Sequence, residues 1–278
     1  HQNKFSYLLD IGTHAEDLFS RMELASKLIE SFRKTIAISQ EDGLEIADFI
    51  KNKLYFAVGV WPHAESILNR EAEIAVLASQ IRKMKKTGFE GFSPSHLIAL
   101  GECGLDRHWN KAHFDELGVK QSMESFLKAE EDFFEMQIGL AQKENLPIIV
   151  HSRDAFEETL ACLKNMNYHR GIIHCYAYGI EEARAFLDLG FHISFSGSIT
   201  YAKKNKIHEY EALSRFIPSD RLLLETDAPF LAPGKYRGKI NTPAFISETY
   251  FFISQARAMS MEDLALLVEK NFKDLFLL

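Results

Sequence analysis

The chain has few cysteines and no long apolar run, and each shortage excludes a class of protein. Its three cysteines, Cys103, Cys162 and Cys175, form an odd and widely spaced set. Such a set argues against a disulfide-stapled secreted domain and fits a reducing compartment. No apolar run reaches the roughly 18 residues that a membrane-spanning helix needs. Because the N-terminus also lacks a signal-peptide pattern, we expect a cytoplasmic protein without a membrane partner.

An excess of positive charge is absent as well, and so are several common catalytic motifs. The formal net charge is −7, whereas proteins that grip long nucleic acids without sequence preference are usually basic. A phosphate substrate stays open, because bound divalent cations reverse the local field. The chain contains no P-loop, no G-x-G-x-x-G element and no G-x-S-x-G elbow. It also has no Pro/Gly/Ser-rich linker, so residues 1–278 are expected to form one domain.

What the chain does contain is eight short apolar runs that alternate with segments of helical period. The runs are Tyr7–Asp10, Thr35–Ile38, Leu54–Val60, Leu97–Gly101, Leu146–His151, Gly171–His174, His192–Phe195 and Leu222–Thr226. The clearest amphipathic segments are 19–32, 126–143, 181–189 and 261–275. Strand alternating with helix eight times predicts an α/β fold of the (β/α)8 TIM barrel type. A doubly wound open sheet is the alternative that periodicity alone leaves open.

Four of these runs lead into residues that ligate metals. Glu102, His151, His174 and Asp227 stand at or just after the ends of four different runs. In a TIM barrel, side chains at the C-terminal ends of the strands converge on one rim. Two carboxylates and two imidazoles there indicate a site for one or two divalent ions, with a bound water as nucleophile. Mg, Mn and Zn all suit such ligands, so the residue types do not decide the metal.

Other residues near strand ends have both a functional and a structural interpretation. His14 is either a metal ligand or a satisfied loop histidine, and His63 is either a phosphate contact or a capped loop residue. Trp61 is expected to be a core or pocket-wall side chain, although a base could stack on it. Arg153 either clamps an anion or pairs with its neighbour Asp154.

The assembled pattern resembles the TatD family of metal-dependent deoxyribonucleases, a branch of the amidohydrolase-like barrels. The resemblance covers nearly the whole chain, from Leu8 to about Ala244. Its most specific segments are a Gly-Glu-x-Gly-Leu-Asp element within 99–106, an Asn-Leu-Pro-x-x-x-His-Ser-Arg-Asp-Ala element at 145–155, His174-Cys175 with 190–197, and a Leu-Leu-Leu-Glu-Thr-Asp-Ala-Pro-x-Leu-Ala-Pro element at 222–233.

The resemblance implies a metallo-dependent hydrolase barrel that cleaves phosphodiester bonds in DNA. Under this interpretation Glu102 bridges two metals, His151 and His174 bind one of them, and His14 and Asp227 bind the other. Asp227 also takes a proton from the attacking water.

Substrate contacts follow from the same resemblance. His63 is expected beside the scissile phosphate, where it completes the catalytic set, and Arg153 offsets the charge that grows on the phosphoryl oxygens. DNA is then the substrate, and the protein is expected to be a monomer without a stable protein partner.

Two positions depart from the family pattern. The first-strand element is usually Asp-x-His-x-His, but here it reads Asp10-Ile11-Gly12-Thr13-His14, so a glycine stands where a histidine is expected. The third-strand element is usually Gly-x-His-Pro-His, and here Trp61 replaces its first histidine. One metal position is therefore expected to lack a ligand, and Glu16 is the hypothesised substitute.

Two rival functions stay open beside the nuclease. The first is a metallohydrolase of a small ester, amide or lactone, which the barrel and the ligands also permit. The second is a degenerate barrel with a weakened metal site that serves as a binding module, which the glycine at position 12 motivates.

Overall fold

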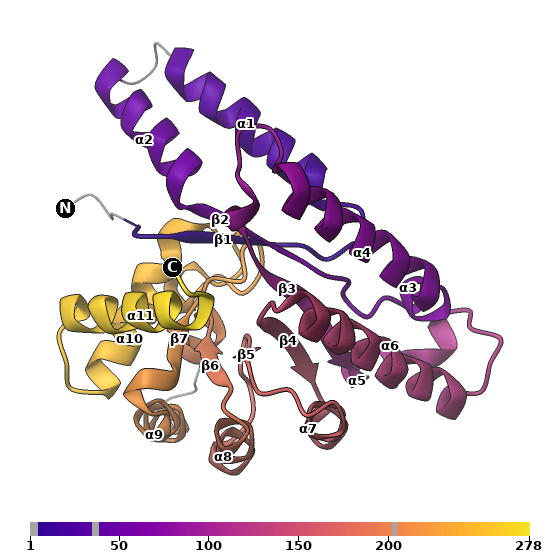
Figure 1. Cartoon of the computed structure of the whole chain (residues 1–278). Helices are drawn as coiled ribbons and strands as arrows, with labels where there is room; N and C mark the ends of the chain where they lie inside the picture. The colour runs from indigo at the N-terminus through magenta and orange to yellow at the C-terminus, as the bar shows by residue number, and fades with distance from the viewer. Residues whose placement is uncertain (1–4, 35–38, 202–204) are drawn as a thin grey trace. The chain divides into compact units, whose positions relative to one another are not determined.

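The computed structural model describes residues 5–34, 39–201 and 205–278. In these residues seven strands alternate with helices (Figure 1). The strands are β1 (Leu8–Ile11), β2 (Leu54–Val58), β3 (Leu97–Asp106), β4 (Ile148–Arg153), β5 (Gly171–Ile173), β6 (His192–Phe195) and β7 (Leu222–Leu224). Seven of the eight predicted runs thus contain strands, and the remaining run, Thr35–Ile38, lies outside the described residues.

The helices fall between the strands, as the sequence pattern predicts. They are α1 (Leu18–Lys34), α2 (Gln40–Lys53), α3 (Ala64–Leu68), α4 (Arg70–Thr87), α5 (Arg107–Asn110), α6 (Met123–Glu144), α7 (Phe156–Asn165), α8 (Ile180–Asp188), α9 (Ile207–Phe216), α10 (Ile246–Ala256) and α11 (Met261–Phe276). Among the described residues, no helix is both long and apolar enough to cross a membrane.

The order of the strands in the sheet decides between the two predicted architectures. They follow one another as β1-β2-β3-β4-β5-β6-β7, so each strand lies next to the strand that precedes it in the chain. Strand β1 pairs with β2, β2 with β3, β5 with β6 and β6 with β7, and all four pairs are parallel. A doubly wound sheet reverses its order near the middle. An unreversed order excludes that alternative and is the order of a barrel.

The described chain divides into two compact units. The N-terminal unit comprises Lys4–Gly104 together with Trp109–Ile148, and the C-terminal unit comprises Leu105–His108 together with Ile149–Leu278. Strand β3 contributes to both. The single domain expected from the sequence stays a prediction.

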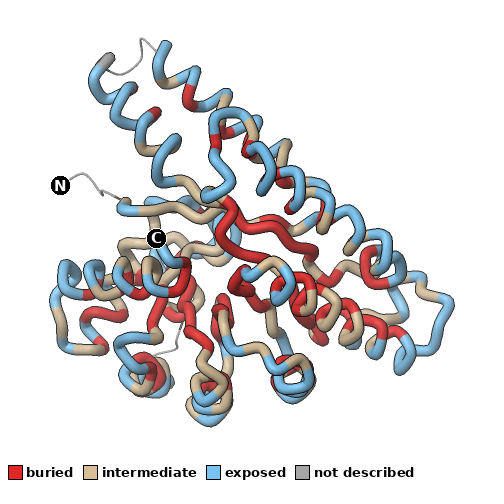
Figure 2. The backbone as a smooth tube through the Cα atoms, viewed as in Figure 1, coloured by how far each residue is buried: buried red, intermediate tan, exposed pale blue. Residues whose placement is uncertain are grey.

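In the N-terminal unit, amphipathic helices cover the strands. Helix α1 turns Leu18, Met22, Ala25 and Ile29 inward at the spacing of a 3.6-residue period. Helix α6 buries Phe126, Phe133 and Phe134, which belong to the largest fully buried side chains of the molecule. Figure 2 shows buried backbone along β2 and β3, where the strands read as continuous apolar runs.

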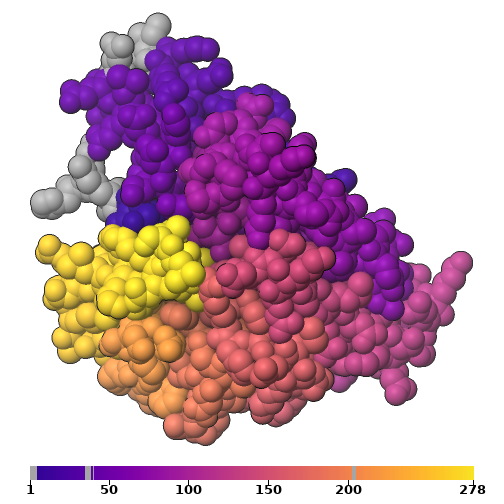
Figure 3. All heavy atoms as spheres, viewed as in Figure 1, coloured from indigo at the N-terminus to yellow at the C-terminus, as the bar shows by residue number. Residues whose placement is uncertain are grey.

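In the C-terminal unit, β5, β6 and β7 form a short parallel core. Phe186 of α8 and Phe195 of β6 are fully buried there. Helix α11 carries Ser260 as its N-cap, whose side chain accepts a hydrogen bond from the Asp263 N–H, and its apolar stripe packs on β7. In the space-filling view, α11 lies on the visible surface of this unit, in yellow (Figure 3).

Strand β3 is longer than predicted, and this changes where Glu102 lies. The apolar run predicts an end at Gly101, but the strand continues to Asp106. Residues 103–106 are all buried, so extended backbone there continues to bury side chains. Glu102 therefore projects from within the strand, five residues after its first residue, Leu97.

Candidate metal centre

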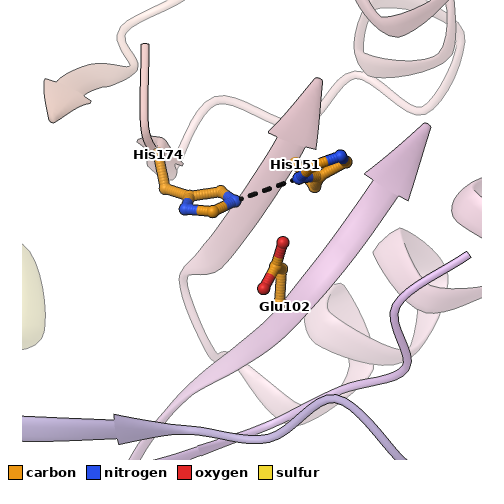
Figure 4. A group of neighbouring side chains, drawn as sticks. All are labelled: Glu102, His151 and His174. Carbon is orange, nitrogen blue, oxygen red and sulfur yellow. Dashed lines mark hydrogen bonds between the residues drawn. The ribbon is translucent and has the colours of Figure 1, made fainter. Parts of the chain in front are cut away.

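Two imidazoles stand next to each other where β4 and β5 deliver them. His151 lies on β4, and His174 follows the last residue of β5. Nδ1 of His151 lies 3.3 Å from Nε2 of His174 (Figure 4). Both side chains are largely shielded from solvent, with 16 % and 6 % of their surface exposed. Two ring nitrogens so close need a proton or a cation between them, because two facing lone pairs repel.

A carboxylate behind each imidazole indicates which nitrogen carries the proton. Oδ2 of the buried Asp106 lies 3.0 Å from Nε2 of His151. Since a carboxylate can only accept, this contact places a proton on Nε2 and leaves the lone pair on Nδ1. Oε1 of Glu225 lies 3.6 Å from Nδ1 of His174, and its charge favours a proton on that nitrogen. With these tautomers, both lone pairs would point into the gap between the rings.

Such a donor set fits a divalent ion. Two nitrogens bound tetrahedrally at about 2.0–2.1 Å are about 3.3 Å apart, which is the separation observed here. The carboxylate of Glu102 completes a group with His151 and His174 in which one ligand atom of each lies within 4.8 Å of the others. Figure 4 shows the three side chains converging. Two histidines and one glutamate form a common catalytic zinc set, with a fourth position left for water.

Close packing of Gly59 against Gly101 sets the position of the Glu102 backbone. A Cβ on Gly59 would come within 2.5 Å of Gly101 Cα, so only glycine lets the end of β2 approach β3 at this point. The Glu102 N–H then donates to the Gly12 carbonyl at 2.7 Å. The backbone on both sides of Glu102 is therefore fixed by neighbouring strands, which leaves its side chain pointing out of the sheet.

His14, Trp61 and His63 form a cluster of rings in the N-terminal unit. The His14 and His63 rings are 5.1 Å apart, and the Trp61 and His63 rings are 4.6 Å apart. Burial, and after it the nearby His14, lower the pKa of His63, so this imidazole is neutral at pH 7. Nδ1 of His14 lies 3.0 Å from the Thr13 hydroxyl.

Buried amides hold the loop that carries Trp61 and His63. The Gln137 side chain of α6 accepts from the Val60 N–H and donates to the Val60 carbonyl, both at 2.9 Å. The Asn110 amide donates to the Pro62 carbonyl at 2.9 Å and to Glu130 at 2.7 Å. Neither amide was a candidate from the sequence, because no local pattern links residues so far apart in the chain.

The other predicted residues lie outside the group of three. Arg153 is the last residue of β4 and is exposed. Asp154, which the sequence offers as an alternative partner of Arg153, lies 3.3 Å from His108. Asp227 lies three residues beyond β7 in the left-handed region, at φ 57°. A non-glycine residue in that conformation is uncommon and often marks a functional loop. The roles of Arg153, His63, His14 and Asp227 stay predictions.

The cysteines beside the candidate ligands behave as small buried side chains. None of the three, all of which lie in described residues, forms a disulfide. Burial raises the pKa of the Cys175 thiol to about 12 and raises the pKa of Cys103 as well. A thiol with a raised pKa is protonated at neutral pH and is therefore a poor nucleophile.

Two groups with clear roles in this geometry were not singled out as ligand supports from the sequence. Asp106 belongs to the Gly-Glu-x-Gly-Leu-Asp element. It stands four residues after Glu102, and residues an even number apart on one strand share a face, so this spacing could have placed Asp106 on the side of the candidate ligands. Glu225 accepts a hydrogen bond from the Cys175 N–H and lies beside His174.

Comparison with known proteins agrees with this geometry. A family model described as TatD related DNase matches residues 9–277. The uncharacterized metal-dependent hydrolase YabD of Bacillus subtilis is 34% identical over 246 residues, which cover 88% of this chain and 84% of that protein. A protein of Pantoea vagans named 3′-5′ ssDNA/RNA exonuclease TatD is 28% identical over 248 residues, covering 87% and 85%.

Solved structures show the same fold. The TatD homologue YJJV of Escherichia coli K12 superposes with a TM-score of 0.70 at 21% identity, covering 98% of this chain and 87% of that one. This likeness confirms the predicted α/β barrel of the metallo-dependent hydrolase type. Together with the match over residues 9–277, it establishes that the chain belongs to the TatD-related DNase family.

Proposed function

We propose that this protein is a divalent-metal-dependent phosphodiesterase that cleaves single-stranded DNA. The observation that carries the proposal is the convergence of Glu102, His151 and His174, with Nδ1 of His151 3.3 Å from Nε2 of His174. A divalent ion there supplies an acidified water as nucleophile and positive charge for the phosphoryl oxygens. Among the three metals that the residue types allow, imidazole-rich ligation favours Zn over Mg and Mn, which prefer oxygen ligands.

The side chains around this group have separate tasks. Asp106 and Glu225 hold the protons on the outer nitrogens of His151 and His174, which keeps the inner nitrogens available as ligands. Asp227, which follows β7, accepts the proton of the attacking water at its carboxylate. The loop conformation at Asp227 is consistent with a side chain held for this task.

Substrate contacts come from the His14–Trp61–His63 cluster and from Arg153. His63 is neutral, so it orients a phosphate through a hydrogen bond rather than through charge. The exposed guanidinium of Arg153 at the end of β4 supplies the charge. The Trp61 ring offers a surface for a base, which an unpaired strand can present and a duplex cannot. The exonuclease of Pantoea vagans, named for single-stranded substrates, supports this choice.

Net charge bears on how DNA would be bound. At a net charge of −7 the protein gains little from counterion release along a long polyanion. Affinity then depends on a few contacts near the reacting phosphate. This favours a short single-stranded segment over a long duplex track.

A comparison of substrates tests the proposal. Metal-stripped protein is incubated with Mg²⁺, Mn²⁺ or Zn²⁺ and with one of three substrates: end-labelled single-stranded DNA, the matching duplex, and a panel of small esters and lactones. We expect shortened single strands with at least one metal, slower loss of the duplex and no ester hydrolysis above background. Hydrolysis of esters without DNA cleavage would replace the nuclease with a small-molecule hydrolase, and no reaction with any substrate would favour a binding module.

A further inference from the structure

The glycine at position 12 is not an empty space in the structure. A Cβ placed on Gly12 would lie 2.6 Å from Nη2 of Arg21 and 2.9 Å from Oδ1 of Asp17. Arg21 belongs to α1 and reaches back to the end of β1. The guanidinium therefore fills the position that a larger residue at 12 would take, and a side chain there would have to displace it.

Arg21 donates hydrogen bonds from all three of its guanidinium nitrogens. Nη1 donates to the Asp10 carboxylate at 2.7 Å and to the Asp10 carbonyl at 3.2 Å. Nη2 donates to the Ala57 carbonyl at 2.8 Å and lies 3.0 Å from Oδ1 of Asp17, which also accepts from Nε at 3.0 Å. With 17 % of the side chain exposed, this is a fixed and largely buried cation.

The two carboxylates at this strand end therefore already share one cationic partner. Asp10 and Asp17 each pair with the guanidinium, and Oδ2 of Asp17 also accepts from the N–H groups of Thr13 and His14 at 3.0 and 3.2 Å. A divalent ion would have to compete with Arg21 for these oxygens and would meet a like charge a few ångströms away.

The same network fixes the loop that leads to the metal centre. Asp17 closes the turn that carries His14, and the Gly12 carbonyl in this loop accepts the Glu102 N–H. A bound metal is one way to hold such a loop, and a guanidinium with two carboxylates is another. Arg21 is thus a positioning residue for the backbone beside Glu102.

We propose that Arg21 takes the place of a second divalent cation, so that the protein binds one divalent ion, on Glu102, His151 and His174. The inference rests on the proposed metal-dependent function. Across the described ranges, 5–34, 39–201 and 205–278, this is the one group of three histidines and carboxylates close enough to hold an ion. Asp10 and Asp17 form ion pairs with Arg21 and not with a second metal ion, so His14 is available to contact substrate. Neither Glu16 nor another ligand is then needed to complete a second site.

Metal stoichiometry tests the inference without reference to activity. Metal-stripped protein is titrated with Zn²⁺ in a calorimeter, and the metal retained after gel filtration is measured by plasma mass spectrometry. We expect one ion per chain in the wild type. Two ions per chain would overturn the inference while leaving the proposed function intact, whereas no bound ion would overturn the proposed function itself.

A pair of variants tests the part played by Arg21. Gly12→His alone is expected to lower the melting temperature and still to bind one ion, because its Cβ meets the guanidinium. In Gly12→His/Arg21→Ala the imidazole has room and both carboxylates are released, so two ions per chain are expected. Arg33→Ala, which removes an exposed arginine of the same helix, is the matched control and should bind one ion. One ion in a folded double variant would show that Arg21 does not set the stoichiometry.

Discussion

Metal affinity in this protein should depend on Asp106, a residue that lies behind a ligand rather than among the ligands. Asp106 is 1% exposed, and its Oδ2 lies 3.0 Å from Nε2 of His151. This contact holds the imidazole tautomer in which Nδ1 carries the lone pair and strengthens Nδ1 as an electron-pair donor. Asp106→Asn keeps the size of the side chain and removes the charge that produces both effects.

Loss of an orienting partner of this kind lowers metal affinity by roughly 10–100-fold, which is about 1.4–2.8 kcal/mol. We expect the Kd for Zn²⁺, measured by competition with a chelating dye at neutral pH, to rise by that factor in Asp106→Asn. Asp115→Asn, at an exposed position, is the matched control and should leave the Kd unchanged. The melting temperature of the metal-stripped variant reports any structural damage. A Kd within about twofold of the wild type would refute the assigned role of Asp106.

Two further predictions concern stability, measured by urea unfolding of metal-stripped protein. Burial of His192 on β6, and after it the nearby Arg221, lower its pKa from 6.5 to about 4. Between these pH values the unfolded chain binds a proton that the folded chain does not, so the wild type should lose up to about 3 kcal/mol as the pH falls through this window. His192→Gln should flatten that loss, and an unchanged slope would contradict the cause. Asn271→Leu should cost about 2–4 kcal/mol, because its Nδ2 donates to the Ser219 and Leu222 carbonyls at 2.7 and 2.8 Å. A cost below about 1 kcal/mol would show that these carbonyls do not depend on it.

The convergence of Glu102, His151 and His174 could be predicted because it follows from topology. In parallel strands that are neighbours in the sheet, residues at the same end of each strand lie close together whatever the helices do. Apolar runs marked those strands well, and a residue that can ligate a metal stands at or just after the end of each run. The metal centre therefore needed no knowledge of side-chain packing.

Residues that support the site could not be predicted in the same way. Gln137 holds Val60 from 77 positions away, and Asp106 could be assigned to His151 only after β3 was seen to continue past Gly101. An extended strand and a strand that ends in a loop give the same local sequence signal when the following residues are apolar and small. Boundary positions are therefore the least certain part of such a prediction.

Arg21 fills the space beside Gly12, where the family pattern has a histidine ligand, and the sequence alone does not predict this. The sequence indicates that glycine at position 12 cannot coordinate an ion, and from this a weak, water-filled or empty metal position follows. A guanidinium in that space was not foreseen, because nothing near Gly12 in the sequence names the residue on α1 that reaches it. The available signal was Asp17 four residues before Arg21, a spacing that pairs opposite charges on one helix face.

We expect a divalent ion on Glu102, His151 and His174 to drive DNA cleavage. The rate at which metal-stripped protein, reloaded with Mn²⁺ or Zn²⁺, shortens an end-labelled single-stranded oligonucleotide tests this role. Glu102→Gln is compared with Glu181→Gln, an exposed carboxylate of α8. We predict cleavage by the reloaded wild type and by Glu181→Gln, and only background for the metal-stripped protein and for reloaded Glu102→Gln. Cleavage that persists in a chelator, or that Glu102→Gln leaves unchanged, would contradict the account.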